Sequence, residues 1–281
     1  MTVLNDLLRP LFDVLQLPLA SLSPAVGVAI WSLPVGVFAL WVFGKTSNQV
    51  RIAAVRRKIH AGLFEIRLFN DDLRAIMRAQ GEILRHVLRY QGLALKPMLF
   101  ILPPLVLVMV QLHQFYGYRG LQPGEQTLMN VQLDNSAVAA GIRPQLSLGL
   151  PQEGVKVVNG PIWAPALAEM SWQLGITAEG DHDLVLTIAG EEIRKSLRAT
   201  GSVVRLSPER PPRGFFGQLE WPSEQPLPDV SVVRSITIAY PEGSVSIFGA
   251  VFLWSFAWLV FFFILSMVVA LALRKPMGIE L

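Results

Sequence analysis

The sequence contains no cysteine and little charge. Among its 281 residues there are 0 cysteines, and only 16% are Asp, Glu, Lys or Arg, whereas an ordinary soluble domain is about 25% charged. The missing cysteines exclude disulfide bonds and thiolate metal sites. The low charge and the 52% of hydrophobic residues are typical of a membrane protein.

Charge is absent altogether from three long stretches. Residues 24–44, 97–116 and 247–273 contain no Asp, Glu, Lys or Arg, and a helix of about 20 apolar residues crosses the hydrocarbon core of a bilayer. The sequence therefore predicts three transmembrane helices over these ranges. The first is not expected to be a cleavable signal sequence, because it lacks a basic leading region and a small-x-small site.

The remaining charge is distributed unevenly between the intervening segments. Residues 1–23 have a net charge of −1, residues 45–96 of +7, residues 117–246 of −4 and residues 274–281 of +1. Lys and Arg near the ends of spans are retained in the cytoplasm. We therefore expect a multi-pass membrane protein with the N-terminus outside and the C-terminus in the cytoplasm. The lack of a clear organelle-targeting signal, together with the outer domain described below, favours the bacterial plasma membrane.

Residues 1–23 contain an amphipathic pattern. Apolar side chains recur at helical spacing, and polar ones lie opposite. The apolar set is Leu4, Leu8, Leu11, Phe12 and Leu15, and the polar set is Asn5, Asp6, Arg9, Asp13 and Gln16. The pattern predicts an interfacial helix on the outer membrane surface, kinked or divided at Pro10.

Residues 45–96 have the pattern of a basic helical hairpin in the cytoplasm. Thr46, Ser47 or Asn48 can cap a first helix, and the turn at 70–72 can cap a second one that ends at Gln91-Gly92. Each helix has an apolar stripe, so the two are expected to pack as an antiparallel coiled coil. The apolar positions are Ile52, Val55, Ile59, Leu63 and Ile66, followed by Leu73, Ile76, Met77, Ile83, Leu84, Val87 and Leu88.

Residues 117–246 change to short alternating apolar stretches separated by Gly and Pro. Seven such stretches occur, at 127–133, 145–150, 155–158, 170–177, 183–189, 202–206 and 230–240. Strands at this spacing predict an extracytoplasmic all-β sandwich-like domain. Residues 207–229, with six prolines, are expected to be irregular. The fold class is therefore an α+β membrane protein with three transmembrane helices.

No motif indicates an enzyme. The four histidines lie on different segments without ligand spacing, so we expect no metal and no other cofactor. The run FGKTS at 43–47 lacks the first glycine of a phosphate-binding loop, and no serine has the surroundings of a nucleophile. Topology and anionic lipid explain part of the positive charge, but a net +7 over 45–96 exceeds what orientation needs. The hairpin is therefore either a lipid-facing basic surface or a docking surface for RNA or for an emerging polypeptide, and DNA is not an expected partner.

The segment EILRHVLRYQGLALKPMLFILPPLVLVMVQLHQF, residues 82–115, carries a family resemblance. A hairpin helix leads through a Gly turn into a span opened by Lys96-Pro97-Met98, and Pro103-Pro104 follows. With the outer helix and the order of spans, this layout resembles the YidC/Oxa insertase superfamily, especially its small three-span Get, EMC and TMCO types. The resemblance covers residues 1–116 and 246–275 and is mainly architectural.

The resemblance implies a function in inserting or assembling membrane proteins without nucleotide hydrolysis. It implies a polar groove open to the cytoplasm, and polar side chains inside the predicted spans are candidates to line it: Ser32, Gln111, Gln114 and Ser266. It also implies that the hairpin receives nascent membrane proteins and the ribosome. The candidate contacts are Arg56, Arg57, Lys58, Arg74, Arg78 and Arg85.

Two departures from the family pattern keep other functions open. The first span, 24–44, has no charged residue, and the domain at 117–246 lies between the second and third spans. The alternative is a structural subunit that anchors an outer β domain to other subunits of a membrane complex. A third reading is a ligand-binding β domain in which Trp163, Trp172 and Trp221 stack on a sugar.

Overall fold

The computed structural model describes residues 1–69, 71–134, 146–151, 153–188, 190–228, 232–247, 250–252 and 256–279. The chain forms two compact units. The first, here called the β unit, comprises Met1–Val28 and Leu107–Leu259. The second, the helical unit, comprises Ala29–Val106 and Val260–Leu281. Each unit is described separately.

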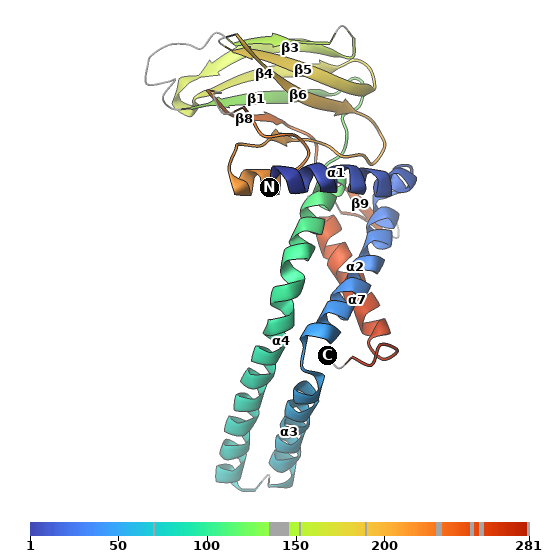
Figure 1. The fold of residues 1–281 in the computed structure, drawn as a ribbon, viewed down its shortest axis with the longest axis vertical. Coiled ribbons are helices and arrows are strands. Elements are labelled where there is room, and N and C mark those ends of the chain that lie inside the picture. Colours follow the sequence, from blue (N-terminus) through green and yellow to red (C-terminus); the bar gives the residue numbers. More distant parts are fainter. Residues whose placement is uncertain are drawn as a thin grey trace. The chain divides into compact units, whose positions relative to one another are not determined.

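The β unit contains two larger antiparallel sheets (Figure 1). The five-stranded sheet has the order β3 (Val155–Ala164), β4 (Glu169–Ile176), β1 (Gln126–Leu133), β8 (Val233–Ile238) and β7 (Glu209–Arg210). The three-stranded sheet has the order β2 (Leu146–Gly149), β5 (Gly180–Ile188) and β6 (Glu191–Ala199). A two-stranded ribbon joins β9 (Val245–Ile247) to β10 (Ala250–Phe252). The prediction of an α+β protein with antiparallel strands is confirmed to this extent.

One apolar core joins the two larger sheets. Along β1, exposed and buried side chains alternate, so that Met129, Val131 and Leu133 point inward. They share a cluster with Trp172 of β4 and Leu186 of β5. Truncation of such a buried leucine to alanine typically costs about 2–5 kcal/mol of stability.

One predicted strand is absent from the structure, and β6 is a long strand that the sequence did not predict. Residues 202–206 form no strand, whereas β6, with the sequence EEIRKSLRA, was not predicted because its composition is charged. The exposed positions of β6 carry most of its charges, whereas Ile193 and Leu197 on the inward face enter the core and Lys195 between them is buried too. Within 207–228, the structure has β7 and the short helix α6 (Phe215–Glu220).

The β unit also contains α1 (Thr2–Gln16) and the short 3-10 helix η1 (Leu17–Leu19). Pro10 lies inside α1 without ending it. The polar face of α1 is turned toward the unit, where Asn5 and Gln16 are buried. Phe12, which was predicted on the opposite apolar face, is buried with them. A helix on the surface of a soluble domain normally buries its apolar face instead.

The helices long and apolar enough to cross a membrane are, within the described residues, α2 (Pro24–Thr46) and α4 (Leu73–Tyr116). The last helix, α7 (Ala257–Leu273), has 17 residues. The predicted third span began at Ile247, but the structure places β9 and β10 there, and the helix begins ten residues later. The uncharged composition of this region did not distinguish an apolar ribbon from a helix.

The expected break between hairpin and second span is absent. The helix α4 continues for 44 residues through Gly92, Pro97, Pro103 and Pro104. Gly92 keeps a helical conformation, so it does not act as the left-handed cap that was predicted. Each proline removes one intrahelical hydrogen bond, but the neighbouring backbone groups remain paired along the helix. The prediction of a helix end at Gln91-Gly92 was therefore wrong.

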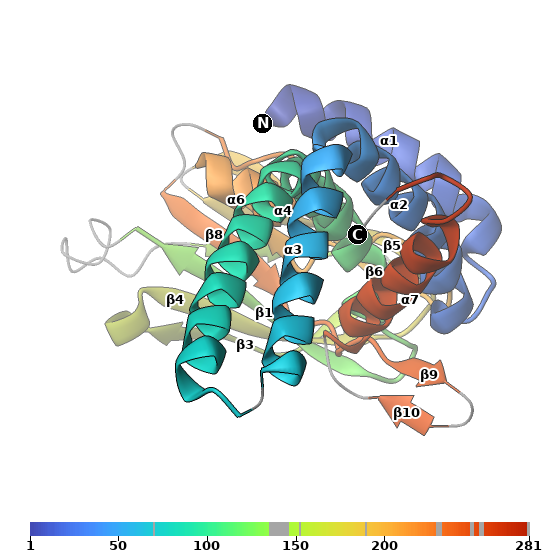
Figure 2. The same ribbon diagram turned by 90° about the horizontal axis from the view of Figure 1, so that it is seen from below.

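The helical unit has α3 (Gln49–Leu68) beside α4 (Figures 1 and 2). Both predicted caps are confirmed: Asn48 Oδ1 accepts from the Arg51 N–H at 3.0 Å, and Asp72 Oδ1 accepts from the Arg74 N–H at 2.8 Å. Gly62 provides the close approach between the helices, since a Cβ there would lie 2.6 Å from Ile83 Cγ1.

Candidate functional site

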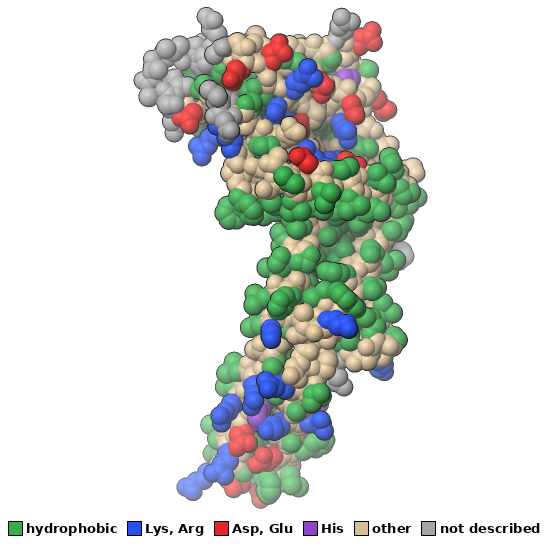
Figure 3. Space-filling model, viewed as in Figure 1, with side chains coloured by type: hydrophobic (Ala, Val, Ile, Leu, Met, Phe, Trp, Pro, Cys, Tyr) green, Lys and Arg blue, Asp and Glu red, His purple; other side chains and the backbone are tan. Residues whose placement is uncertain are grey.

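The candidate site for polypeptide contact is the surface of the α3–α4 hairpin. All six predicted contact residues are exposed, with Arg56, Arg57 and Lys58 on α3 and the remaining three on α4. Those three are Arg74, Arg78 and Arg85. Lys and Arg side chains gather over this hairpin in the space-filling view (Figure 3). The surface is therefore available to an anionic partner.

The hairpin buries less of its apolar surface than its sequence predicted. Ile52 and Val55 are buried in the seam, together with Ala79 of α4. Other members of the predicted seam are exposed: Leu63, Leu73, Met77, Leu84 and Leu88. Phe64, Leu68 and Phe69, near the end of α3, are exposed as well. The hairpin thus combines positive charge with apolar side chains that no described part of the chain covers.

The four candidate groove residues do not come together in one cluster. Ser32 and Ser266 belong to the helical unit, and each hydroxyl donates to its own helix, at 2.7 Å to the Ala29 carbonyl and at 3.1 Å to the Phe263 carbonyl. Their polar groups are therefore satisfied within apolar helices, which is what a helix in lipid requires.

Gln111 and Gln114 belong to the β unit, at the end of α4. Both are buried. Gln114 Oε1 accepts from Ser223 Oγ at 3.1 Å, and Gln114 Nε2 donates to the Glu220 carbonyl at 3.3 Å. Gln114 therefore anchors the segment around α6 to the end of α4.

Arg205, which the sequence analysis did not single out, is a buried cation that holds α1. Its Nε donates to Asp13 Oδ1 at 2.7 Å, and its Nη1 donates to Gln111 Oε1 at 2.8 Å. The guanidinium also lies 4.7 Å from the centroid of the Phe115 ring. Burial lowers the pKa of Arg205, and Asp13 acts in the opposite direction.

Lys195 is a second buried cation missed from the sequence, and its side chain is 0% exposed. Its Nζ donates to Ser207 Oγ at 2.9 Å, to the Ser207 carbonyl at 2.5 Å and to Glu224 Oε2 at 3.1 Å. Burial lowers the pKa of Lys195, while Glu224 raises it. Its inward position, between Ile193 and Leu197 in an alternating strand, was the signal that could have identified it.

The lysine and serine of this cluster are arranged for structure rather than for nucleophilic catalysis. A catalytic lysine must accept the proton of the serine hydroxyl. Here Ser207 Oγ donates to the Glu209 carbonyl at 3.4 Å and accepts from the lysine, which is also paired with Glu224. The cluster therefore fixes the 207–224 segment to β6.

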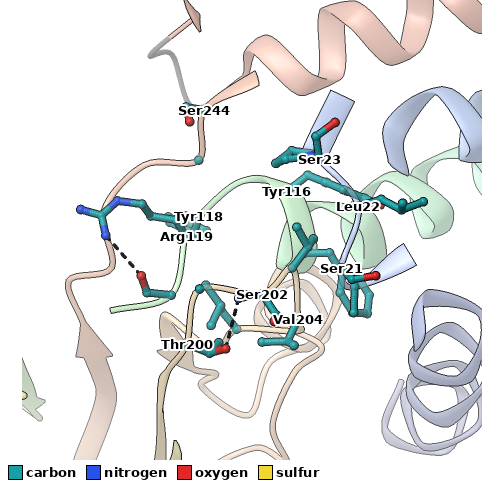
Figure 4. Close-up of a pocket in the computed structure, with 18 of the residues that line it drawn as sticks. Ser21, Leu22, Ser23, Tyr116, Tyr118, Arg119, Thr200, Ser202, Val204 and Ser244 are labelled. Carbon is teal, nitrogen blue, oxygen red and sulfur yellow. Dashed lines mark hydrogen bonds between the residues drawn. The ribbon is translucent and has the colours of Figure 1, made fainter. Parts of the chain in front are cut away.

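A cleft of about 530 Å³ lies within the β unit, between the 20–24 turn, the 118–122 segment and the 200–204 loop (Figure 4). Arg119 contributes a guanidinium to its lining, but Glu125 pairs with that group at 2.7 Å. The remaining labelled polar side chains are mainly hydroxyls. The cleft thus presents hydroxyl groups with little uncompensated charge.

The described residues contain no group of three or more His, Asp or Glu side chains that could hold a metal ion. Of the three tryptophans considered for sugar stacking, Trp172 is buried in the β core, and Trp163 packs partly buried against it. Comparison with protein-family models and with curated proteins gives no match.

Proposed function

We propose that this chain is an integral membrane protein that aids the insertion or assembly of other membrane proteins. In this proposal α2, α4 and α7 are the spans, the hairpin lies in the cytoplasm and the β unit faces the opposite side. The protein belongs to the plasma membrane and uses no nucleotide hydrolysis. The outer β unit then forms the sandwich-like domain expected from the sequence.

The observation that best supports this proposal is that α4 is one continuous helix. Its first part carries exposed arginines and exposed apolar side chains, and the same uninterrupted helix then becomes an apolar segment of membrane length. A polypeptide bound to the hairpin is therefore held on a helix that leads directly to the membrane. Because a client's own apolar segment is stabilised by transfer into lipid, no fuel is needed for this step.

The test exploits the absence of cysteine. Single cysteines carrying a photo-crosslinker are introduced at Arg78 and Ser266, and at Val268 as an exposed apolar control on α7. The full chain in native membranes is then exposed to ribosomes stalled on a short membrane protein. Crosslinks from Arg78 and Ser266 to the nascent chain, but not from Val268, support the proposal.

The alternative function predicts a different crosslinking pattern. A subunit that anchors the β unit needs partners for its exposed hairpin side chains but does not contact nascent chains. Crosslinks from Arg78 only to resident membrane proteins would overturn the insertase proposal and favour the anchor. The exposed apolar residues of the hairpin are the observation that keeps this second function in consideration.

A further inference from the structure

An apolar–arginine pair occurs four times along the hairpin part of α4. The pairs are Leu73-Arg74, Met77-Arg78, Leu84-Arg85 and Leu88-Arg89. At 100° per residue, spacings of four, seven and four residues place the four apolar side chains within a narrow stripe on one face. The four arginines form a parallel row on one side of that stripe.

The structure leaves both rows open. The stripe residues Leu73, Met77, Leu84 and Leu88 are 72%, 62%, 61% and 64% exposed, and the four arginines are exposed too. The face that meets α3 is a different one, containing Ala79 and Ile83. The stripe is therefore additional to the seam of the hairpin.

We infer that this stripe and its arginine row bind a helical segment of a client polypeptide that carries an apolar stripe beside a row of acidic residues. The apolar rows pack together, and each arginine pairs with a carboxylate. This deepens the proposed function and rests on it for the identity of the occupant as a client.

Charge argues against a second copy of this chain as the occupant. Between residues 73 and 96, Glu82 is the one acidic residue, and at 100° per residue it lies on the side away from the stripe. Two copies facing each other would therefore offer the arginines no row of carboxylates to pair with. An acidic row is the complement that the arginines require.

Geometry argues against the lipid surface. The same helix continues into the apolar segment that starts at Pro97, so in the proposed orientation it leaves the membrane rather than lying along it. At 1.5 Å per residue, the stripe extends from roughly 13 to 36 Å beyond that point, and the headgroup layer is only about 5–7 Å thick. Most of the stripe is therefore out of reach of lipid.

The test measures binding of two fluorescent peptides to the full chain in nanodiscs of zwitterionic lipid. Both peptides are stapled helices of about 20 residues with a leucine stripe; one has Glu beside each leucine and the other has Lys. The expected result is at least about tenfold tighter binding of the Glu peptide. Equal binding of the two peptides, or no binding of either, overturns the inference.

Three variants locate the binding. The first is the leucine variant, Leu84→Ser/Leu88→Ser, which should weaken binding of the Glu peptide about tenfold or more. The second is the arginine variant, Arg85→Glu/Arg89→Glu, which should weaken binding of the Glu peptide by the same factor and improve binding of the Lys peptide. The matched control is Arg51→Glu/Arg67→Glu, which makes the same charge change at two exposed α3 positions outside the six candidate contacts and should alter binding less than about threefold. An equal loss in the control means that only the general positive field matters, and the inference fails.

Failure of the inference is distinguishable from failure of the proposed function. If Arg78 crosslinks to the nascent chain but the Glu peptide binds no more tightly than the Lys peptide, the insertase proposal stands and the inferred charge pairing is wrong. If the Glu peptide binds more tightly but Arg78 crosslinks only to resident membrane proteins, the partner that occupies the stripe is not a client polypeptide. Effects of the arginine variant without any effect of the leucine variant would indicate a purely ionic partner and would also overturn the inference.

Discussion

The two buried cations of the β unit hold segments that are far apart in the sequence. Lys195 connects β6 to Ser207 and Glu224, and Arg205 connects the 200–207 segment to Asp13 of α1. Breaking a buried ion pair by removing one partner typically costs about 3–5 kcal/mol, because the other charge is left buried without compensation. Substitution should therefore matter most for stability at the Lys195–Glu224 pair, because both of its side chains are largely buried, whereas Asp13 is half exposed.

Replacing Lys195 with methionine is predicted to destabilise the β unit. Lys195→Met leaves Glu224 without its cation and should cost about 3–5 kcal/mol. The thermal unfolding midpoint of the full chain in detergent should fall, and hydrogen exchange over β6 should accelerate. The control is Arg194→Met on the same strand, whose side chain is exposed; an equal effect in both variants would contradict a role for the buried pair.

Glu125 is predicted to contribute a small acid-sensitive term to stability. The hydrogen bond from Arg119 is the main cause that lowers the pKa of Glu125 below its ordinary value of 4.5. The unfolded chain, with the ordinary pKa, binds a proton more readily than the folded chain. The stabilisation is therefore present above about pH 4.5 and is lost as the pH falls through the lowered pKa.

The measurement compares thermal midpoints of the protein and of Glu125→Gln between about pH 6 and pH 3. Because both partners are partly exposed, the difference should not exceed about 1 kcal/mol. The variant should lose less stability on acidification than the parent chain. A steeper loss in the variant would show that the sign of the linkage is wrong.

At the scale of elements, α1 is unusual in having its apolar face open. Val3, Leu7, Leu11 and Val14 are exposed, while Asn5 on the opposite face donates to the Gln218 carbonyl of α6 at 2.6 Å. Phe215 and Phe216 of α6 are exposed too. Hydrophobic side chains line the unit along α1 in Figure 3. Polar contacts with the protein and an apolar exterior are what a helix seated on lipid requires.

The prediction is that α1 contacts lipid in the outer interface. An environment-sensitive fluorophore on Leu7→Cys or Leu11→Cys in the full chain in nanodiscs should be quenched by spin-labelled lipid and shielded from aqueous iodide. The same fluorophore on Glu191→Cys, at the exposed end of β6, should behave in the opposite way. Iodide quenching of both α1 positions as strong as at Glu191 would exclude the lipid contact.

The hairpin offers a matched pair of glycines. A Cβ at Gly62 would lie 2.6 Å from Ile83 Cγ1, whereas a Cβ at Gly81 would meet no atom within 4 Å. Gly62→Ala should therefore separate α3 from α4, and Gly81→Ala should stabilise α4 by roughly 1 kcal/mol through helix propensity alone. Distances between spin labels on exposed residues of the two helices should broaden for the first variant and stay unchanged for the second.

The elements that the sequence predicts well are those determined by local signals. The caps at Asn48 and Asp72 follow from side-chain chemistry within one turn, and both are present. The continuity of α4 through Gly92 could not be predicted from local signals. Glycine and proline locally predict the end of a helix, but α4 continues through them. Likewise β6 reads as a polar segment until its partners in the sheet show which of its side chains point inward.

The candidate site was predictable in part for the same reason. Exposure of the six predicted contact residues, five arginines and Lys58, follows from their charge, and all six are exposed. Which apolar residues the hairpin leaves open could not be read from spacing, since Leu84 and Val87 both fit a helical stripe. The four polar residues of the predicted spans could not be grouped without tertiary structure, and Gln111 proved to be a partner of Arg205.

At the scale of the whole molecule, the distribution of charge predicts one orientation. Cysteine introduced at Glu191 of the β unit should react with a membrane-impermeant maleimide in intact cells, and cysteine at Gln80 of the hairpin should react only after permeabilisation. Both positions are exposed, so labelling reports on the side of the membrane rather than on burial. Labelling of Gln80 in intact cells would contradict the proposed cytoplasmic hairpin.

The arginine row of α4 is predicted to be dispensable for that orientation. Changing Arg74, Arg78, Arg85 and Arg89 to glutamine lowers the net charge of residues 45–96 from +7 to +3, which still differs in sign from the −4 of residues 117–246. By the positive-inside rule, the quadruple variant should therefore keep the labelling pattern of the parent chain. If it retains this topology but loses binding of the Glu peptide, the row serves recognition; if its orientation inverts, the row is needed for topology.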